Sequence, residues 1–312
     1  MNIVVLGGTG FVGSHLIPRL SGLGHQLTVL SRNPATKPEL SVLPSVKLAA
    51  VDVYDAAALA AAVRGADAVI NLVGILNEKG FGGGGFRRAH VELTQHVIAA
   101  CKAAGVRRLL QMSALNAGRG ESHYLKTRGE AETAVKASGL DWTIYQPSVI
   151  FGPGDGLFGR FKSLLAIAPV LPLARASTKF APVYVGDVVA AMVKTLNDST
   201  AHNQVFELYG PEVLSLAEIV RYTARCMHLR RLVIPLPDSL GRLQALIMDF
   251  VPGKPFSTDN FLSLKLDSVG GIDGLYRLKL DKTPIEAVIP QILFPQGKQA
   301  RLDRYRGASG RP

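Results

Sequence analysis

The feature that most constrains this chain is a glycine-rich turn that follows a short apolar segment near its amino terminus. Residues 3–6 have the composition of a buried strand, and apolar residues recur at helical spacing over residues 11–23. In such a strand–turn–helix unit, Gly7 can make the tight turn, Gly10 lets the backbone approach a pyrophosphate, and Gly13 lets helix and strand pack closely. Unpaired N–H groups at the helix start would attract the phosphates. The turn predicts a dinucleotide site, against the alternative of a turn without a ligand. The predicted contact residues here are Gly7, Thr9, Gly10, Phe11, Val12 and Gly13.

Strand and helix patterns alternate through the first half of the chain. Further strands are expected at residues 26–31, 46–51, 68–73, 108–112 and 142–145. This alternation, with short connections, predicts an α/β fold with a Rossmann-type, doubly wound parallel sheet.

The pattern becomes less regular and richer in proline after a turn signal at residues 151–156. We expect an NAD(P)-binding domain over residues 1–151, with its sheet completed by about residues 182–210. Residues 152–181 and 211–295 would form a smaller C-terminal α/β lobe, followed by a basic tail, 296–312.

Three segments carry local predictions. Pro18 lies inside the first predicted helix and removes one intrahelical hydrogen bond, so a kink or a loosened turn is expected there. The glycine run 82–85 predicts a mobile loop before a helix over residues 88–104. Residues 240–251 form an amphipathic segment whose apolar face we interpret as lobe core rather than as a membrane-surface helix. The apolar residues at helical spacing are Leu243, Leu246, Ile247 and Phe250.

The formal net charge is +11, and the tail is strongly basic. Such a tail suits anionic lipid, an acidic protein or nucleic acid, and a solvated end is the alternative. The rest of the chain has no nucleic-acid motif, which argues against a nucleic-acid partner. The tail's basic residues are Lys298, Arg301, Arg304, Arg306 and Arg311, against Asp303.

Composition also bears on compartment and metal content. Two cysteines in 312 residues fit reduced thiols in the cytoplasm, and no residues have metal-ligand spacing. No apolar run reaches membrane-spanning length. We expect a cytoplasmic protein, with peripheral contact to the inner face of the membrane through residues 240–251 and 296–312 as a further expectation.

The chain resembles the short-chain dehydrogenase/reductase superfamily in its extended and atypical, epimerase/dehydratase-like branches. The resemblance extends to about residue 295. Residues 69–76 are most similar to the NADPH-binding accessory subunits of mitochondrial respiratory complex I and their bacterial relatives. Besides the glycine turn, the matching positions are Asp52, Asn71-Leu72-Val73-Gly74, Tyr124, Gln146-Pro147-Ser148-Val149 and residues 183–188.

The end of the second predicted strand bears on the choice of cofactor. NAD sites commonly place an acidic residue about 20 residues past the glycines, where it bonds the ribose 2′-hydroxyl. Here the strand ends in Ser31 and Arg32, which suit a 2′-phosphate, so we favour NADP(H) over NAD(H). The alternative is that Arg32 points into solvent.

The resemblance implies the remaining cofactor contacts. Asp52 and Val53 would contact the adenine, and Leu72, Val73 and Gly74 would line the adenosine ribose side. Pro147 and Val149 would lie near the nicotinamide, and Met112, Tyr124 and Arg128 complete the expected contacts.

Catalytic residues in this superfamily are a tyrosine acid/base, a lysine four residues later and a serine or threonine. In this chain the residue four positions after Tyr124 is Arg128, and Lys126 would lie about 200° away around the helix. Arginine keeps the charge, but its planar fork changes the geometry. Ser113 is the candidate hydroxyl, although it stands one position early. Tyr124 as an acid/base and Tyr124 as a cofactor-packing residue remain open alternatives.

These observations predict an NADP(H)-binding protein with weak or lost hydride transfer. By resemblance, it would be an accessory or assembly protein linked to respiratory NADH:quinone oxidoreductase or to quinone metabolism. One alternative is an active NADP-dependent reductase, dehydrogenase or epimerase acting on a sugar-nucleotide, sterol-like or quinone-like substrate. Another is an NADPH redox sensor. The sequence leaves open whether the protein is an enzyme.

Overall fold

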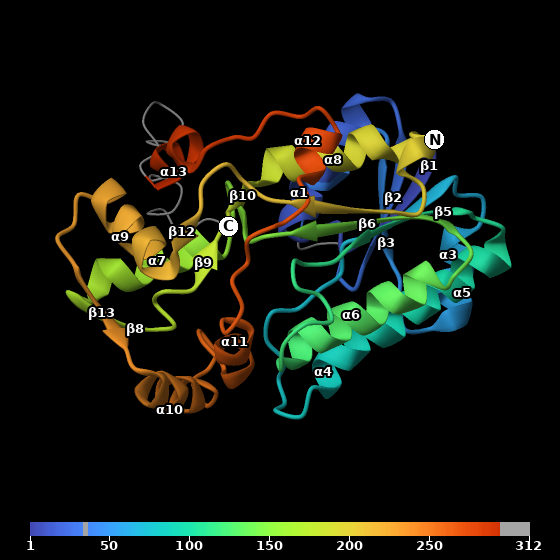
Figure 1. The fold of residues 1–312 in the computed structure, drawn as a ribbon. Coiled ribbons are helices and arrows are strands. Elements are labelled where there is room, and N and C mark those ends of the chain that lie inside the picture. The colour runs from blue at the N-terminus through green and yellow to red at the C-terminus, as the bar shows by residue number, and fades with distance from the viewer. Residues whose placement is uncertain (34–36, 294–312) are drawn as a thin grey trace.

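A seven-stranded parallel sheet forms the centre of the molecule (Figure 1). The computed structural model describes residues 1–33 and 37–293, so the expected basic tail, 296–312, lies outside the described residues. The strand order is β11-β6-β5-β4-β1-β2-β3, and every pairing is parallel. The order reverses between β1 and β4, the switch point at which such sheets bind ligands. The strands are β1 (Asn2–Leu6), β2 (Gln26–Ser31), β3 (Val46–Ala50), β4 (Ala68–Asn71), β5 (Arg108–Met112), β6 (Asp141–Pro147) and β11 (Gln204–Leu208).

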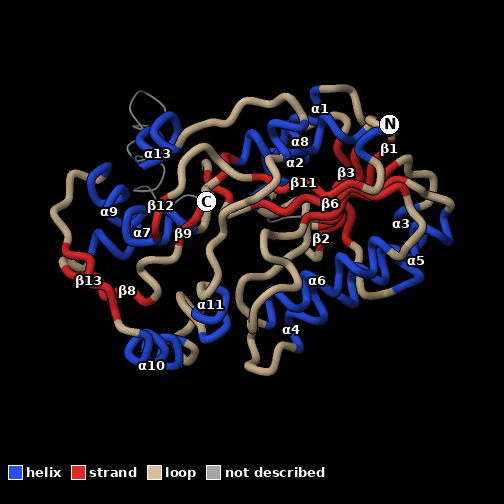
Figure 2. Tube along the Cα trace, in the orientation of Figure 1, coloured by secondary structure: helices blue, strands red, loops and turns tan. Residues whose placement is uncertain are grey.

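Helices cover both faces of this sheet, as the blue layers on either side of the red strands show (Figure 2). Alternate strand residues face opposite layers: Val5 packs in the cluster with α1, whereas Val4 and Leu6 pack in the cluster with α3 and α5. Both faces are therefore apolar, which explains the near-continuous apolar strands in the sequence. One layer contains α1 (Phe11–Gly22), α2 (Pro38–Ser41), α8 (Val185–Leu196) and α12 (Gly274–Arg277); the other contains α3 (Ala56–Val63), α5 (Leu93–Ala104) and α6 (His123–Lys136).

The glycine run is only partly the loop that the sequence predicts. Gly84 and Gly85 begin a short helix, α4 (Gly84–Arg87), which continues through a π-helical turn, Arg88–Glu92, into α5. The reason is a buried carboxylate: Glu78 accepts hydrogen bonds from the backbone N–H groups of Gly83 and Gly85, both at 2.6 Å. Glu78 thereby caps a helix that its glycines alone would not favour.

The remaining elements form a smaller lobe beside the sheet (Figure 1). Its own apolar core includes Leu165, Leu173 and Val220. Three two-stranded sheets lie outside the main sheet: β7–β10, β9–β12 and the parallel pair β8–β13. The strands are β7 (Ile150–Phe151), β8 (Val170–Ala174), β9 (Lys179–Phe180), β10 (Val183–Tyr184), β12 (Leu214–Ser215) and β13 (Leu232–Leu236). The helices are α7 (Leu157–Ile167), α9 (Leu216–Cys226), α10 (Asp238–Met248), α11 (Thr258–Ser263) and α13 (Ile285–Leu293).

Two parts of residues 211–295 differ from expectation. Helix α12 packs against β11, and its Leu275 belongs to the core of the main sheet rather than to that of the lobe. The interpretation of residues 240–251 as lobe core is wrong, because the predicted core residues Leu243, Leu246, Ile247 and Phe250 are 50–73% exposed. No helix within residues 1–33 and 37–293 is long and apolar enough to cross a membrane.

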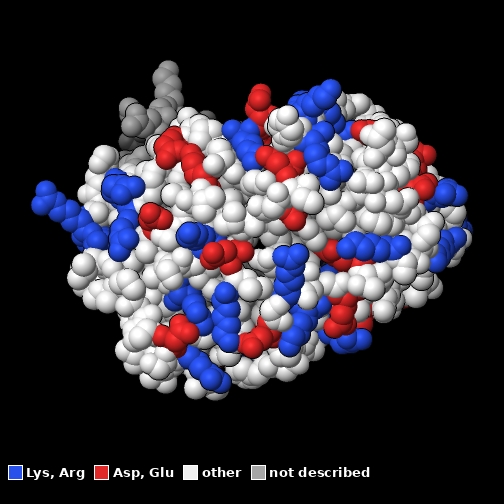
Figure 3. Space-filling view, viewed as in Figure 1, with Lys and Arg blue, Asp and Glu red and all other residues white. Residues whose placement is uncertain are grey.

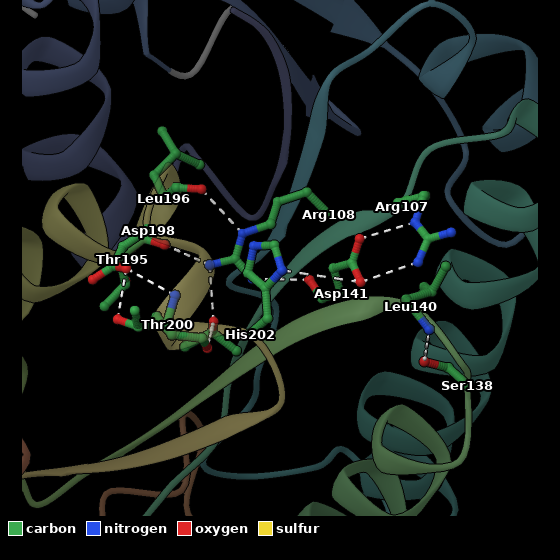
Figure 4. Close-up of polar contacts among 12 residues, drawn as sticks. Arg107, Arg108, Ser138, Leu140, Asp141, Thr195, Leu196, Asp198, Thr200 and His202 are labelled. Atoms are coloured by element: carbon green, nitrogen blue, oxygen red, sulfur yellow. Dashed lines mark hydrogen bonds and ion pairs between the residues drawn. The ribbon is translucent and has the colours of Figure 1, made fainter.

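A buried arginine fixes the amino-terminal edge of the sheet. The Arg108 guanidinium donates to the Leu196 carbonyl at 3.0 Å, to the Asp141 carbonyl at 2.8 Å and to the Thr143 hydroxyl at 2.9 Å. Figure 4 shows Arg107 on the other side of Asp141, where it forms an ion pair with that carboxylate. This network ties the end of α8 to β5 and β6, opposite the edge where the glycine turn lies.

Candidate functional site: a dinucleotide cleft

The glycine turn follows β1 at the carboxyl edge of the sheet. Gly7 has a φ of +74°, and the Gly10 N–H donates to the Gly7 carbonyl at 3.0 Å. A Cβ at Gly13 would lie 2.3 Å from the Gly8 carbonyl oxygen, so only glycine allows α1 to approach the turn this closely. The structure thus shows the tight turn at Gly7 and the close approach of α1 at Gly13, and the role of Gly10 beside a pyrophosphate stays a prediction.

The start of α1 suits a phosphate. Gly10 caps the helix without a side-chain hydrogen bond, which leaves first-turn N–H groups facing outward from the turn. Because there is no side chain at Gly10 and no acidic residue in the first turn, a pyrophosphate can approach the backbone without repulsion. The residues present therefore fit a dinucleotide.

The ends of β2 and β3 lie where the adenosine of a dinucleotide is expected. Ser31 ends β2, and Arg32 is exposed beside it. Asp52 accepts a hydrogen bond from the Tyr54 N–H at 3.0 Å, and Val53 packs against the apolar cluster of the α3 layer.

A second guanidinium, which sequence reasoning missed, lies on this side. The Cζ atom of Arg88 lies 4.3 Å from the centre of the Tyr54 ring. Burial raises the pKa of the Tyr54 phenol, and the positive charges of Arg88 and Arg32 oppose that rise. Arg88 belongs to the π-helical turn, 56 residues beyond Arg32, and no sequence motif joins the two.

Two amides fix the end of β4. Buried Asn71 donates through its side-chain nitrogen to Gln111 at 3.0 Å, and its side-chain oxygen accepts from the Val73 N–H at 3.1 Å. Gly7 lies against the same segment, because a Cβ there would be 2.9 Å from the Leu72 carbonyl carbon. The segment Leu72–Gly74 therefore borders the glycine turn directly.

Tyr124 and Arg128 lie on one face of α6, as the four-residue spacing predicts. The Arg128 Cζ is 5.6 Å from the centre of the Tyr124 ring. Its Nη1 donates to the Met112 carbonyl at 2.9 Å and to the Val73 carbonyl at 3.4 Å, so the guanidinium bridges the ends of β5 and β4. Gly74 makes room for it, since a Cβ there would lie 1.9 Å from Nη2.

The Arg128 guanidinium is incompletely bonded, in contrast to Arg108. Its side chain is buried, and its Nε has no hydrogen-bond partner within the described residues. A buried, partly unsatisfied cation is costly unless a ligand completes its bonding. The hydroxyls of a cofactor ribose are acceptors that this position could use.

Ser113 is oriented toward a carboxylate and not toward Tyr124. Its hydroxyl donates to buried Glu132 at 2.5 Å, and the Gln146 amide donates to the same oxygen at 2.7 Å. No hydrogen bond joins Ser113 to Tyr124 in residues 1–33 and 37–293. The structure therefore brings together two of the three predicted catalytic residues. Glu132 could not be foreseen as the partner of Ser113, because the contact depends on how α6 docks.

The last predicted contacts follow β5 and β6. Met112 and Pro147 are buried at the ends of these strands, and the Pro147 carbonyl accepts from the Leu115 N–H at 2.9 Å. The Val149 carbonyl accepts from the Val183 N–H at 3.0 Å, which links this edge to the segment that leads into α8.

His90 contacts α6 through the Thr127 hydroxyl and remains neutral. Its Nδ1 lies 2.9 Å from the Thr127 hydroxyl, whose proton goes to helix carbonyls, and its Nε2 accepts from the Ile75 N–H at 3.2 Å. Burial, aided by the charge of Arg128, lowers the pKa of His90 to about 2. His90 therefore holds the helix in place and does not donate a proton near neutral pH.

A cavity of about 260 Å³ opens beside the first turn of α6. The Asp259 carboxylate from α11 accepts from the backbone N–H groups of His123, at 2.6 Å, and Tyr124, at 3.2 Å. The lobe thereby caps the helix that carries Tyr124. The cavity's lining includes Phe81, Phe86, His123, Leu246, Lys254 and Asp259.

Comparisons with known proteins agree with this geometry. Residues 7–156 match a family model described as NAD(P)H-binding. The chain is 28% identical over 278 residues to "NADH dehydrogenase [ubiquinone] 1 alpha subcomplex subunit 9, mitochondrial" of Arabidopsis thaliana, covering 86% of this chain and 68% of that protein. It is 28% identical over 240 residues to a ceramide reductase of Caulobacter vibrioides, covering 76% and 74%.

The fold has close structural counterparts. The dTDP-glucose 4,6-dehydratase DesIV of Streptomyces venezuelae, solved with NAD, superposes with a TM-score of 0.76 at 18% identity, over 94% of this chain and 96% of that one. At this identity the likeness shows the fold alone. Residues 7–156 thus match an NAD(P)H-binding family, the fold is a Rossmann-type fold shared with a dehydratase solved with NAD, and the chain as a whole is similar to complex I accessory subunits.

Proposed function

We propose that the chain is an NADP(H)-binding accessory or assembly protein whose hydride transfer is weak or lost. The main support is the set of hydrogen bonds made by the residues at the predicted catalytic positions. Arg128 bridges two strand-end carbonyls, and Ser113 donates its proton to Glu132. A superfamily acid/base needs a hydroxyl and a cation free to act with the tyrosine. Here the hydroxyl is engaged elsewhere, which supports cofactor retention over turnover.

The role as an accessory subunit rests on the relatives. One of them carries the name of a complex I subunit, and the match spans most of this chain. We infer a partner among the proteins of respiratory NADH:quinone oxidoreductase or of quinone metabolism. A nucleotide that stays bound would then stabilise this protein in the form that binds its partner, and it would not be consumed.

The preference for NADP(H) is supported by Arg32 and Arg88. Arg32 is exposed at the end of β2 and Arg88 lies over the Tyr54 ring, and guanidinium groups bind a 2′-phosphate in bidentate fashion. Titrating the protein with NADPH, NADP⁺, NADH and NAD⁺ tests this. Arg32→Ala should weaken the binding of NADPH at least about tenfold, a change of about 1.4 kcal/mol in binding free energy, and leave the binding of NADH nearly unchanged.

The matched control for that titration is Arg64→Ala, which removes an exposed arginine from the loop after α3. It should leave both affinities unchanged. Equal weakening of NADPH and NADH by Arg32→Ala, or a wild-type preference for NADH, would contradict the proposed specificity.

A working reductase is the second candidate, favoured by the cavity beside His123 and by the relative named ceramide reductase. A working reductase should oxidise NADPH with a carbonyl or quinone acceptor as the wild-type protein and lose that activity in Tyr124→Phe, whereas Arg128→Lys tests what the arginine does. If the site is a lapsed reductase, lysine should raise NADPH oxidation with a carbonyl or quinone acceptor, and Tyr124→Phe in the same background should abolish that gain. If Arg128 serves to hold the cofactor, the substitution should chiefly weaken NADPH binding.

A further inference from the structure

Helix α10 presents its large apolar residues to the outside. Leu240, Leu243, Leu246 and Ile247 are 50–56% exposed and fall within about 120° of the helix circumference. The inward face is made of small residues, because Gly241 and Ala245 are the buried positions of this helix. The amphipathic pattern of α10 is thus reversed with respect to the lobe that it packs on.

The apolar surface continues beyond the helix. Phe250, 73% exposed, follows α10, and its ring centre lies 5.5 Å from that of Phe81, which is 61% exposed on the loop before α4. Leu76 on the same loop is 63% exposed. We call the surface formed by residues 240–250 of α10 and its extension, together with Leu76 and Phe81, the α10 face. The run of exposed apolar residues along one side of α10 and the Phe81–Phe250 contact mark an interaction site rather than scattered surface residues.

The charges around the α10 face are positive. Arg242 and Lys79 are exposed, and Lys254 lies with its ammonium 4.2 Å from the centre of the Phe81 ring. The nearby carboxylates are either buried or paired with another arginine. Asp249 and Glu78 are buried and accept hydrogen bonds from the protein, and Asp238 forms an ion pair with Arg175 at 2.9 Å.

We propose that the α10 face docks on an anionic lipid bilayer. An exposed apolar helix face with aromatic anchors and basic neighbours matches the chemistry of the bilayer interface, where the apolar groups enter the acyl boundary and the cations meet lipid phosphates. A second copy of the chain fits less well. A twofold contact through this face would bring the cations of both copies to one interface, where Asp238, already paired with Arg175, is the exposed carboxylate of α10.

The arrangement also connects the membrane to the candidate site. Leu246 and Phe81 of the α10 face and the neighbouring Lys254 line the 260 Å³ cavity, together with His123 of α6 and Asp259 of α11. Figure 1 shows α10 at the lower edge of the smaller lobe, and Figure 3 shows that edge as largely uncharged atoms, with lysine, arginine and acidic side chains beside them. Docking through the α10 face would therefore turn the mouth of this cavity toward the lipid.

Vesicle flotation of the full chain tests the proposal. Vesicles of phosphatidylcholine containing phosphatidylglycerol should carry the wild-type protein with them, and pure phosphatidylcholine vesicles should carry much less. The double variant Leu243→Glu/Phe250→Glu should lose at least about tenfold in binding to the anionic vesicles. Arg242→Glu should reduce binding mainly to the anionic vesicles.

The control is the double variant Val42→Glu/Ile272→Glu, which adds the same charge at exposed apolar positions, 76% and 64% exposed, outside the α10 face. Circular dichroism and thermal melting establish that each variant is folded. Undiminished flotation of Leu243→Glu/Phe250→Glu would overturn the proposal and assign lipid binding to another segment. A wild-type dimer without lipid that this variant alone dissociates would instead show that a second copy covers the face, and would also overturn it.

Discussion

Gly13 sets the distance between α1 and the turn that would hold the pyrophosphate. An added Cβ meets the Gly8 carbonyl oxygen at 2.3 Å, and that contact is with backbone, which cannot move without opening the turn. We expect Gly13→Ala to weaken NADPH binding at least about tenfold, or about 1.4 kcal/mol, in a fluorescence titration. Gly22→Ala is the control in the same helix, because a Cβ there meets nothing within 4 Å. Equal affinity in the two variants would show that the turn is not the phosphate site.

His90 gives the protein a specific sensitivity to acid. Its pKa is about 2 when folded, from burial and the nearby Arg128 charge, and about 6.5 when unfolded. Below pH 6.5 the unfolded chain binds a proton that the folded protein does not, so stability falls as the pH drops. Urea unfolding at pH 8 and pH 5 measures this effect. Between these two pH values the free energy of unfolding of the wild type should fall by about 2 kcal/mol more than that of His90→Gln. His228→Gln, at an exposed position, should lose as much as wild type.

At the scale of elements, strands β2 and β5 lie where the sequence predicts them, because a parallel sheet covered on both faces leaves a plain apolar pattern. Helix α4 and the π-helical turn were missed, since they depend on Glu78 capping glycines that favour a loop by themselves. The exposure of α10 was also missed. Periodicity identifies an apolar face, but not whether the fold covers that face.

The site, too, was predictable where it depends on residues close in sequence and not where it depends on how distant elements pack. The glycine turn and the Tyr124–Arg128 pair are local in sequence, and both assemble as expected. Contacts between distant elements were not predictable: Arg88 over Tyr54, and Ser113 on Glu132, depend on helix docking.

The capping of α6 by the lobe is testable at this scale. Asp259 accepts two backbone N–H groups at the positive end of the helix, and burial raises its pKa. Asp259→Ala should lower the free energy of unfolding by about 1–2 kcal/mol, because it leaves both donors unpaired. Asp238→Ala, at the exposed first turn of α10, should change it by less than about 0.5 kcal/mol. Urea denaturation measures both, and equal effects would show that the Asp259 contact contributes little.

At the scale of the whole molecule, the 260 Å³ cavity lies between the start of α6, the helix of the candidate site, and the α10 face of the lobe. The sheet domain supplies the fit to a dinucleotide, α6 carries the Tyr124–Arg128 pair, and α11 joins that helix to the lobe. NADPH at 100 times its dissociation constant should stabilise the protein by about 2.7 kcal/mol. Calorimetry at increasing NADPH measures this, and an unchanged melting temperature would contradict a specific dinucleotide site.

The most direct test of the central claim is the fate of NADPH on the protein. The purified chain is loaded with one equivalent of NADPH, separated from free nucleotide and mixed with a quinone or carbonyl acceptor. Nicotinamide absorbance then reports the oxidation of NADPH. Displacement of the bound NADPH by excess NADP⁺ reports its exchange. We predict that NADPH stays bound, reduced and slow to exchange. Rapid oxidation with release of NADP⁺ would contradict the account and establish a turning-over reductase.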